Sequence, residues 1–514
     1  MKSVMKHQFS DLPKVGVPRS SFNRSCGVKT TFDAGDIVPV YYDEVLPGDT
    51  FNMDTTAFAR MATPIFPLMD NAYMDMHYFF VPTRLVWNNW EKFNGAQDNP
   101  DDSIDFTIPT MTAPASGGHA VGDLSDYFGI PTGVNSLQHS SLLHRAYNLI
   151  WNDWYRDENL QDSITVDKGD GPDTSTNYVV KKRGKRHDYF TSCLPWPQKG
   201  SEVSLPLGIS AEVHAPVNYP NNLSVFNDDG NYYSNLYVAS PNVRVNNAND
   251  GDASRTLYAD LSNASSATIN DLREAFATQR LLERDARGGT RYISLIKSHF
   301  GVTSPDARLQ RPEFLGGSSS PIIVTPIEQT SSTDATSPQG NLAAKGTVQI
   351  GNAGFTKSFT EHGYIIGLVS VRADLTYQQG LDRALSRSTR YDFYLPSLAN
   401  LGEQAVLNKE IYAQGTTADD DVFGYQERWA ELRYKRSSIT GKFRSTYAQS
   451  LDAWHLSQEF GSLPTLGSDF IEENAPFDRV VAVNTEPHFI FDAYMKVKAA
   501  RPLPIYSVPG LDKL

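Results

Sequence analysis

The segments with strand-forming sequence stand in two groups, one near each end of this 514-residue chain. They are rich in β-branched and aromatic residues and bounded by proline or glycine, which is typical of β-strands. By residue number they are 37–47, 76–87, 321–325, 347–350, 364–371, 479–484 and 487–498. Segments with helical periodicity lie between the groups, at 141–158, 269–286 and 292–300. Because strands and helices do not alternate, the order favours an antiparallel β sandwich with helical and loop insertions over a doubly wound sheet.

Residues 201–265 differ in composition from the sequence around them. They contain no lysine, seven acidic residues and two arginines, which gives a net charge of −5, and asparagine recurs throughout. Acidic sequence rich in asparagine and serine, with short apolar runs, is typical of exposed loops and hairpins. We therefore expect an insertion carried by a scaffold, and the scaffold's function has to be inferred from the flanking sequence.

The formal net charge of −13 is distributed unevenly along the chain. Residues 1–30 carry six cations against Asp11 alone, which predicts a basic N-terminal arm. No apolar run approaches the roughly 20 residues that span a bilayer, and the arm lacks the apolar stretch of a secretory signal. We therefore expect no membrane insertion and a cytosol-like compartment. The two cysteines, Cys26 and Cys193, predict reduced structural thiols and not a disulfide framework.

Sequence signals for catalysis or cofactors are weak. Gly441-Lys442 lacks the other residues of a phosphate-binding loop, and Gly316-Gly317 is typical of a turn. His139 and His144 would diverge on a helix, so no shared metal is expected. The acidic clusters at 98–105 and 419–421 do not match a calcium loop and indicate solvated loops. No catalytic residue, cofactor or metal is predicted, although a glycosidase needs only two suitably separated carboxylates and stays an alternative.

The densest basic segment interleaves cations with three aromatic residues, Trp429, Tyr434 and Phe443. Its cations are Arg428, Arg433, Lys435, Arg436, Lys442 and Arg444. Cations that neutralise phosphates and rings that stack on unpaired bases are what a groove for single-stranded nucleic acid requires. A salt-bridged surface or a subunit contact explains the same residues equally well. The basic cluster at 181–186 has the same two interpretations.

Several long segments of the sequence match, in the same order, segments of one family of proteins. One is Arg145-Ala-Tyr-Asn-Leu-Ile-Trp-Asn-Asp-Trp-Tyr-Arg, and the others lie within 31–50, 62–71, 90–95, 183–192, 281–292, 298–313 and 422–428. Together they resemble the major capsid proteins of gokushoviruses, which are small single-stranded DNA bacteriophages of the microvirus family. The resemblance spans nearly the whole chain and fails mainly in 201–265 and in the loops near 100–125 and 325–345.

This resemblance implies a mainly β fold, an eight-stranded antiparallel jelly-roll barrel with large loop and helical insertions. The implied organisation is a basic arm at 1–30, the first part of the jelly roll at 31–200, a variable surface insertion at 201–265, and helices with the remainder of the jelly roll at 266–514. The implied function is that of a structural major capsid protein and not an enzyme. About sixty copies would form a T=1 icosahedral shell around a circular single-stranded DNA genome, assembled in the host cytoplasm.

The resemblance also implies partners for particular segments. Scaffold, pilot and small DNA-binding viral proteins are expected, and the insertion at 201–265 would form a threefold protrusion that meets a host surface receptor. Candidate receptor-facing residues are Asn227, Asp228, Tyr232 and Tyr233, and the six cations of 428–444 are candidate genome-facing residues. The alternative is a free oligomeric jelly-roll protein that binds a carbohydrate or receptor through the same tyrosine- and asparagine-rich tract.

Overall fold

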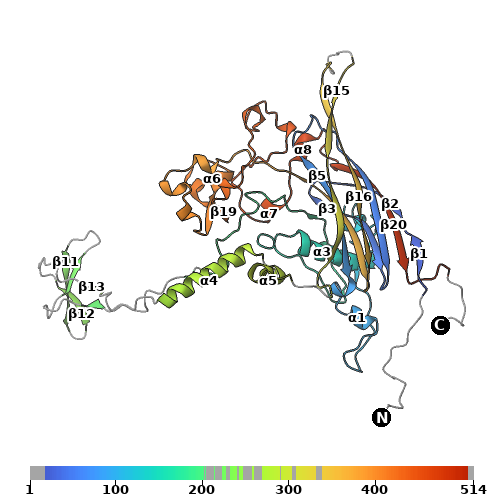
Figure 1. The fold of residues 1–514 in the computed structure, drawn as a ribbon, viewed down its shortest axis with the longest axis horizontal. Coiled ribbons are helices and arrows are strands. Elements are labelled where there is room, and N and C mark those ends of the chain that lie inside the picture. The colour runs from blue at the N-terminus through green and yellow to red at the C-terminus, as the bar shows by residue number, and fades with distance from the viewer. Residues whose placement is uncertain are drawn as a thin grey trace, which may run out of the picture. The chain divides into compact units, whose positions relative to one another are not determined.

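The computed structural model describes residues 18–201, 203, 269–289, 291–303, 308–331 and 338–506, together with the backbone of the strands between 213 and 259 (Figure 1). The chain divides into two compact units. The barrel unit comprises Met1–Pro197 and Pro305–Leu514, and the second unit comprises Gln198–Ser304.

The barrel unit is built on two antiparallel sheets. The first contains, in spatial order, β2 (Cys26–Phe32), β20 (Phe489–Arg501), β4 (Thr50–Met61) and β16 (Leu342–Ser358). The second contains β14 (Glu313–Pro321), β5 (Ala72–Pro82), β17 (Gly363–Ala373) and β3 (Asp36–Val45). Numbered along the chain, these strands lie as 1-8-3-6 and 5-4-7-2, which is the jelly-roll order. The expectation of a mainly β, antiparallel jelly-roll fold is confirmed.

Short strands extend the edges of both sheets. They are β1 (Ser20–Asn23), β15 (Ile323–Glu328) and β8 (Lys181–Lys182), so that the sheets hold six and five strands. Outside the sheets, β6 (Thr110–Thr112) pairs with β7 (Gln138–Ser140), and β18 (Glu403–Leu407) pairs with β19 (Val422–Glu427).

The two sheets have different burial patterns because they are covered differently. In β4, residues alternate strictly between buried and exposed, so that Phe51 and Met53 enter the core and Asn52 faces outward. In β5 and β17 nearly every residue is buried. One face of these two strands contributes to the barrel core, and the other packs against a second apolar cluster that includes α3 (Leu142–Ile150). A sheet covered on both faces therefore has a nearly continuous apolar sequence.

The first large insertion joins β5 to β14. In the barrel unit it contains, besides α3, the short helices η1 (Thr83–Leu85), α1 (Trp90–Phe93), α2 (Leu124–Tyr127), η2 (Trp151–Tyr155) and η3 (Ser175–Asn177). Figure 1 shows α3 beside the second sheet, which it contacts through β5 and β17. The helix predicted over 141–158 is confirmed, and its last turn, η2, is a π-helix.

The second large insertion joins β17 to β20. Its short helices are η6 (Arg383–Leu385), η7 (Arg390–Asp392), η8 (Pro396–Leu398), α6 (Asn408–Ile411), η9 (Thr417–Asp420), η10 (Ala430–Leu432), η11 (Gly441–Phe443), η12 (Asp452–Trp454), α7 (Ser468–Ile471) and α8 (Phe477–Val480). A third apolar cluster joins this insertion to Phe190 and Cys193. The insertion thus has a core of its own beside the barrel.

The second unit contains the strands β9 (Val213–His214), β10 (Leu223–Phe226), β11 (Tyr232–Ala239), β12 (Asn242–Asn246) and β13 (Tyr258–Ala259). Its two helices are α4 (Ile269–Arg287) and α5 (Tyr292–Phe300), and both predicted helices are confirmed. His299 Nε2 lies 2.6 Å from Asp285 Oδ1 and links α5 to α4. Gly301 ends α5 with φ of +70°, a backbone conformation that favours glycine.

Two local predictions are wrong for physical reasons. The strand predicted over 479–484 does not form. Arg479 and Val480 belong to α8, because Phe477 and Val480 lie one helical turn apart and are both buried, and Val481 makes only an isolated bridge to Pro64. The turn predicted at Gly316-Gly317 lies inside β14. A Cβ at Gly317 would lie 2.4 Å from the carbonyl oxygen of Met76, so glycine is needed for close strand approach and not for a turn.

Candidate nucleic-acid interface

The predicted basic segment begins directly after β19. Trp429 follows that strand with φ of +65°, and its indole Nε1 donates to the carbonyl oxygen of Leu398 at 3.1 Å. This ring is only 5% exposed, so it packs inside the insertion and cannot stack on a base. Tyr434 is 46% exposed and is the aromatic residue of the segment that offers a substantial ring surface.

The structure does not gather all six cations around one cavity. Lys435 and Arg436 line a cavity of about 190 Å³, together with Tyr434 and residues of η6 and η10. The other four, Arg428, Arg433, Lys442 and Arg444, lie outside its lining. Two of the six cations therefore share a cavity, and four do not.

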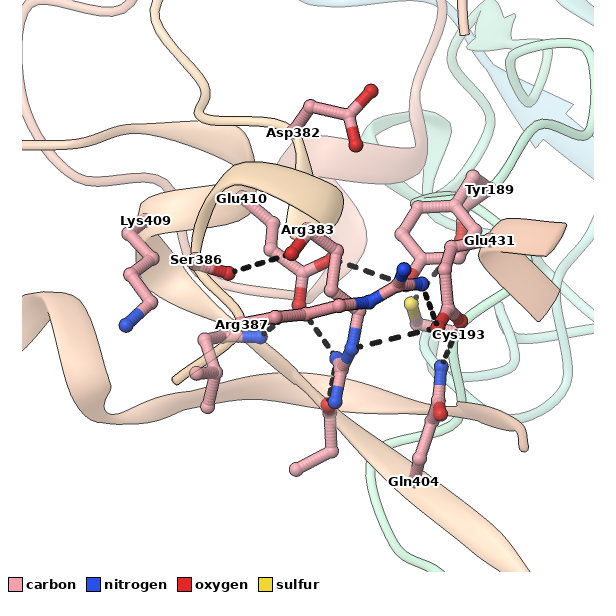
Figure 2. A network of polar contacts seen from close by, with 12 residues as sticks. Tyr189, Cys193, Asp382, Arg383, Ser386, Arg387, Gln404, Lys409, Glu410 and Glu431 are labelled. Atoms are coloured by element: carbon pink, nitrogen blue, oxygen red, sulfur yellow. Dashed lines mark hydrogen bonds and ion pairs between the residues drawn. The ribbon is translucent and has the colours of Figure 1, made fainter. Parts of the chain in front are cut away.

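A network of ion pairs underlies this cavity (Figure 2). Arg383 donates to Glu410 Oε1 at 2.8 Å, and the hydroxyl of Tyr189 donates to Glu410 Oε2 at 3.1 Å. The backbone amide of Leu407 also donates to Glu410 Oε1, at 3.0 Å. Glu410 is 2% exposed, and burial raises the pKa of its carboxyl while the charge of Arg383 opposes that rise. Both carboxylate oxygens have partners, so the group serves to hold the insertion together.

A second carboxylate completes the network. Arg387 Nη2 lies 3.4 Å from Glu431 Oε1, and Arg383 Nε lies 3.9 Å from the same oxygen. Gln404 donates to Glu431 Oε2 at 2.7 Å. Figure 2 shows the two arginines between the two carboxylates, which balances charge within the insertion. Each carboxylate oxygen of Glu410 and Glu431 thus has a hydrogen-bond partner in this network.

The cations of the predicted segment differ in how firmly they are held. Arg436 donates to the carbonyl oxygens of Glu410 and Gly380, both at 2.8 Å, and Arg444 donates to that of Gln378 at 2.6 Å. These two arginines fix loop geometry. Lys435 instead pairs with Asp382 at 3.0 Å while its side chain is 84% exposed.

The other three cations differ in the groups that they contact. Arg433 pairs with Glu427 at 2.5 Å, with its side chain 56% exposed. The Arg428 guanidinium lies 4.9 Å from the Trp429 ring centroid, and Lys442 Nζ lies 5.7 Å from that of Tyr447. Exposed ion pairs contribute little stability, so Arg433 and Lys435 are available to a phosphate, as is the exposed Lys442.

The cluster at 181–186 is largely built into the barrel unit. Arg183 donates to Asp75 Oδ2 at 2.5 Å and is 9% exposed, and Lys185 is 5% exposed. Arg186 pairs with Asp374 at 2.8 Å and lies over the ring of Tyr73. Arg183 and Lys185 are therefore part of the barrel interior, whereas the Lys182 side chain is 42% exposed in its pair with Asp36.

The sequence did not point to two further arginines, Arg383 and Arg387, that also line the 190 Å³ cavity. Arg383 and Arg387 stand four residues apart in 380–390, with Arg390 following. This spacing was the available signal. What no local pattern shows is their pairing with Glu410 and Glu431, which lie 27 and 44 residues farther along the chain respectively.

Three histidines also lie close together, although the spacing of His139 and His144 predicted that they diverge. They do not share a helix, because His139 lies in β7 and His144 in α3, and their ring centroids are 5.3 Å apart. His119 Nε2 lies 3.0 Å from His139 Nε2, and His144 Nε2 hydrogen-bonds Ser125 at 2.9 Å. Burial, followed by the neighbouring histidines, lowers the pKa of His144 to about 3. The three rings thus pack without charge on His144 at neutral pH.

Three further features were considered in the sequence: metal ligands, a membrane-spanning segment and the candidate receptor-facing residues. In the part of the chain that the structure describes, no group of three His, Cys, Asp or Glu side chains is arranged to hold a metal ion. No helix of that part has the length and apolarity to span a bilayer. Tyr232 and Tyr233 lie in β11, described by its backbone alone, and Asn227 and Asp228 lie outside the described residues.

A comparison with models of protein families covers nearly the whole chain. The model described as capsid protein (F protein) of phages matches residues 10–511. The chain belongs to this capsid protein family. Capsid protein VP1 of Bdellovibrio phage phiMH2K is 50% identical over 529 residues, which is 98% of each chain. Capsid protein VP1 of Chlamydia phage 1 is 43% identical over 100% of this chain and 99% of its own length.

A third relative points the same way. Capsid protein VP1 of Spiroplasma virus 4 is 40% identical over 99% of this chain and 98% of its own length. The resemblance to gokushovirus capsid proteins is thereby confirmed. The chain is a structural capsid protein of the virion and not an enzyme.

Proposed function

We propose that about sixty copies of this capsid protein close into a T=1 icosahedral shell around a circular single-stranded DNA genome. The jelly-roll strand order, in a chain related to capsid proteins over 98% of its length, carries the proposal. One subunit type in equivalent icosahedral positions gives this copy number. Scaffold, pilot and small DNA-binding viral proteins are the further partners that we propose for assembly.

Exposed apolar side chains support burial between copies. On α4, Ile269, Leu272 and Phe276 recur at helical spacing and are 70%, 38% and 65% exposed. On β15, Ile323 and Ile327 point to one face and are 63% and 51% exposed. Contiguous exposed apolar residues of this kind are typical of surfaces that a partner subunit covers.

We propose that the basic segment 428–444 and the arm at 1–30 face the genome. Arg433 and Lys435 contribute most, because their exposed ion pairs are easily exchanged for bonds to phosphate. For single strands, the log–log slope of binding against salt falls by roughly 0.7 for each phosphate that the protein no longer neutralises. Replacing both residues with glutamine should therefore lower that slope. A particle in which both side chains lie on the outer surface would refute this assignment.

We propose that the insertion at 201–265 projects outward and attaches the particle to its host. Its net charge of −5 and its lack of lysine suit a surface kept away from the genome. Replacing residues 205–262 with a short linker should leave shell assembly intact and abolish or redirect adsorption to host cells. If this variant does not fold, the insertion is part of the barrel and the proposal is wrong.

Shell formation itself is tested on α4. Phe276→Glu should prevent closed particles in electron micrographs while the circular dichroism spectrum stays unchanged, because the side chain is 65% exposed and not part of the core. Glu274→Gln, on the opposite side of the helix, is the matched control and should assemble normally. Closed shells from Phe276→Glu would remove α4 from the proposed contacts. Free trimers of the unaltered protein that never close would support the receptor-binding alternative.

A further inference from the structure

A cavity of about 380 Å³ lies in the barrel unit, away from the basic segment already described. Its walls come from β5, β17, η2 and the residues after it, from 183–191, from the start of β14 and from the end of α7. The volume lies in the range of roughly 300–1,000 Å³ in which proteins bind small ligands. The lining combines cations with aromatic rings, and two of the cations, Arg183 and Lys185, belong to the basic cluster at 181–186.

Cations outnumber carboxylates in the lining of the cavity. The lining contains Arg156, Arg183, Lys185 and Arg372 against the single carboxylate Asp157. Asp75 lies behind this wall and is shared, because Arg183 Nη1 and Arg372 Nη2 lie 2.5 and 3.1 Å from the same Oδ2 oxygen. Glu473 is also buried near Lys185 and Arg372, and burial raises its pKa to about 7. The four cations therefore outnumber the nearby carboxylates Asp75, Asp157 and Glu473, which leaves positive charge that an anion can neutralise.

Two of these arginines have a hydrogen-bond donor without a partner. The Nε atoms of Arg156 and Arg372 are both buried, and neither makes a hydrogen bond. A buried donor without an acceptor destabilises the fold, and an oxygen of a bound anion would satisfy it. His77 adds no charge at neutral pH, because burial, together with the charge of Arg183, lowers its pKa to about 4.

Aromatic rings also line the cavity. Phe314 and Trp154 are 43% and 38% exposed, with ring centroids 6.0 Å apart. The indole Nε1 of Trp154 donates to the carbonyl oxygen of Pro312 at 2.8 Å, which fixes the ring. The Arg311 guanidinium lies 5.1 Å from the same ring and brings a further cation to the rim. The exposed rings offer flat surfaces on which a planar group can stack.

We propose that this cavity binds one unstacked nucleotide of single-stranded nucleic acid. The phosphate binds at Arg156 and Arg372, and the base stacks on Phe314 and Trp154. An inorganic anion alone would leave the rings unused, and an apolar ligand would leave the arginines unneutralised. The assignment rests on the proposed function, because the enclosed genome is the source of the nucleotide.

The test measures binding of a fluorescently labelled ten-nucleotide oligo(dT) to the full-length unassembled protein by anisotropy. Phe314→Leu keeps an apolar side chain but removes the ring, and stacking on one ring corresponds to a loss of roughly five- to 150-fold in affinity. Arg156→Gln should weaken binding and reduce the salt slope by roughly 0.7. Phe58→Leu, at a 50% exposed phenylalanine of β4 on the other sheet, is the matched control and should bind as the unaltered protein does.

Two further measurements separate the outcomes. Thymidine monophosphate should compete with the oligonucleotide more strongly than inorganic phosphate, and equal competition would reduce the cavity to an anion site and overturn the proposal. Unchanged oligonucleotide affinity of both Phe314→Leu and Arg156→Gln would also overturn it. If these variants lose affinity but no shell forms, the nucleotide site stands and the shell proposal fails. If shells enclose DNA and the variants bind normally, only the nucleotide site fails.

Discussion

The buried ion pair between Arg145 and Asp173 gives the sharpest stability prediction. Arg145 is 0% exposed and donates to both carboxylate oxygens of Asp173, with Nε to Oδ2 at 2.7 Å and Nη2 to Oδ1 at 2.5 Å. Its Nη1 also donates to the carbonyl oxygens of Val86 and Gly169, at 3.1 and 2.8 Å. Arg145→Met removes all four bonds and leaves Asp173 buried without its cation. Removing one partner of such a pair costs about 3–5 kcal/mol of unfolding free energy.

The same pair predicts how this loss depends on pH. Burial acts to raise the pKa of Asp173, but hydrogen bonds from Arg145 and Tyr178 hold it below the ordinary value. A carboxylate with a depressed folded pKa stabilises the fold above its unfolded pKa of about 4 and loses that contribution as the pH falls through the folded pKa. In Arg145→Met the unpaired carboxylate has a raised pKa and takes up a proton more easily. The stability difference between the two proteins should therefore narrow as the pH falls from 7 towards about 4.

The assay is urea unfolding of the unassembled protein, monitored by the fluorescence of tryptophans such as Trp87 and Trp151. Both lie in the apolar cluster that includes α3. The double variant Arg145→Met/Asp173→Leu should regain part of the loss, because no buried charge remains. Lys29→Met is the control, since the Lys29–Asp492 pair is exposed and worth at most about 1 kcal/mol. A loss below about 0.5 kcal/mol in Arg145→Met, or a difference that widens as the pH falls, would refute the reasoning.

Two other predictions concern packing and thiol access. Gly317→Ala should lower the unfolding free energy by at least about 2 kcal/mol, because its Cβ would meet a backbone oxygen at 2.4 Å. Gly351→Ala is the control and should stay within about 1 kcal/mol of the unaltered protein, because a Cβ there would have no atom within 4 Å. Equal effects of the two substitutions in urea unfolding would contradict the strand geometry. Iodoacetamide should modify the exposed Cys26 of the folded protein and spare Cys193, because Cys193 is 2% exposed and burial raises the pKa of its thiol. Equal modification rates of the two thiols, measured by mass spectrometry, would show that Cys193 is accessible.

The sequence predicted the elements whose pattern is strong and local. The strands β3, β5, β17 and β20 are rich in β-branched and aromatic residues, and α3 carries an apolar stripe. The strand β4 was missed because its outward positions include Asn52 and Asp54 and its inward ones include Thr55 and Ala57, so that only the alternation marks it. Val480 and Val481 look like strand residues, yet tertiary packing makes the first of them part of a helical turn.

The candidate site was less accessible to sequence reasoning. Six cations within seventeen residues suggested a single surface, but the structure uses Arg436 and Arg444 to bind backbone carbonyls and leaves Lys435 exposed. The partners of such groups come from distant segments, as when Arg183 meets Asp75 inside the barrel unit. Local composition reports the number of charges, and only the fold determines which of them are already neutralised. Family resemblance supplied the capsid assignment that these patterns left open.

The central claim is that this chain builds a closed shell, and the mass of the assembled particle tests it most directly. Sixty copies of a 57.1 kDa chain have a protein mass of about 3.4 MDa, to which the genome and any partner proteins add. Charge-detection mass spectrometry of purified particles should give this protein mass plus the mass of the enclosed DNA. Disrupted particles should release single-stranded DNA that nuclease treatment removes. A largest species of about 170 kDa, the mass of a free trimer, would contradict the account.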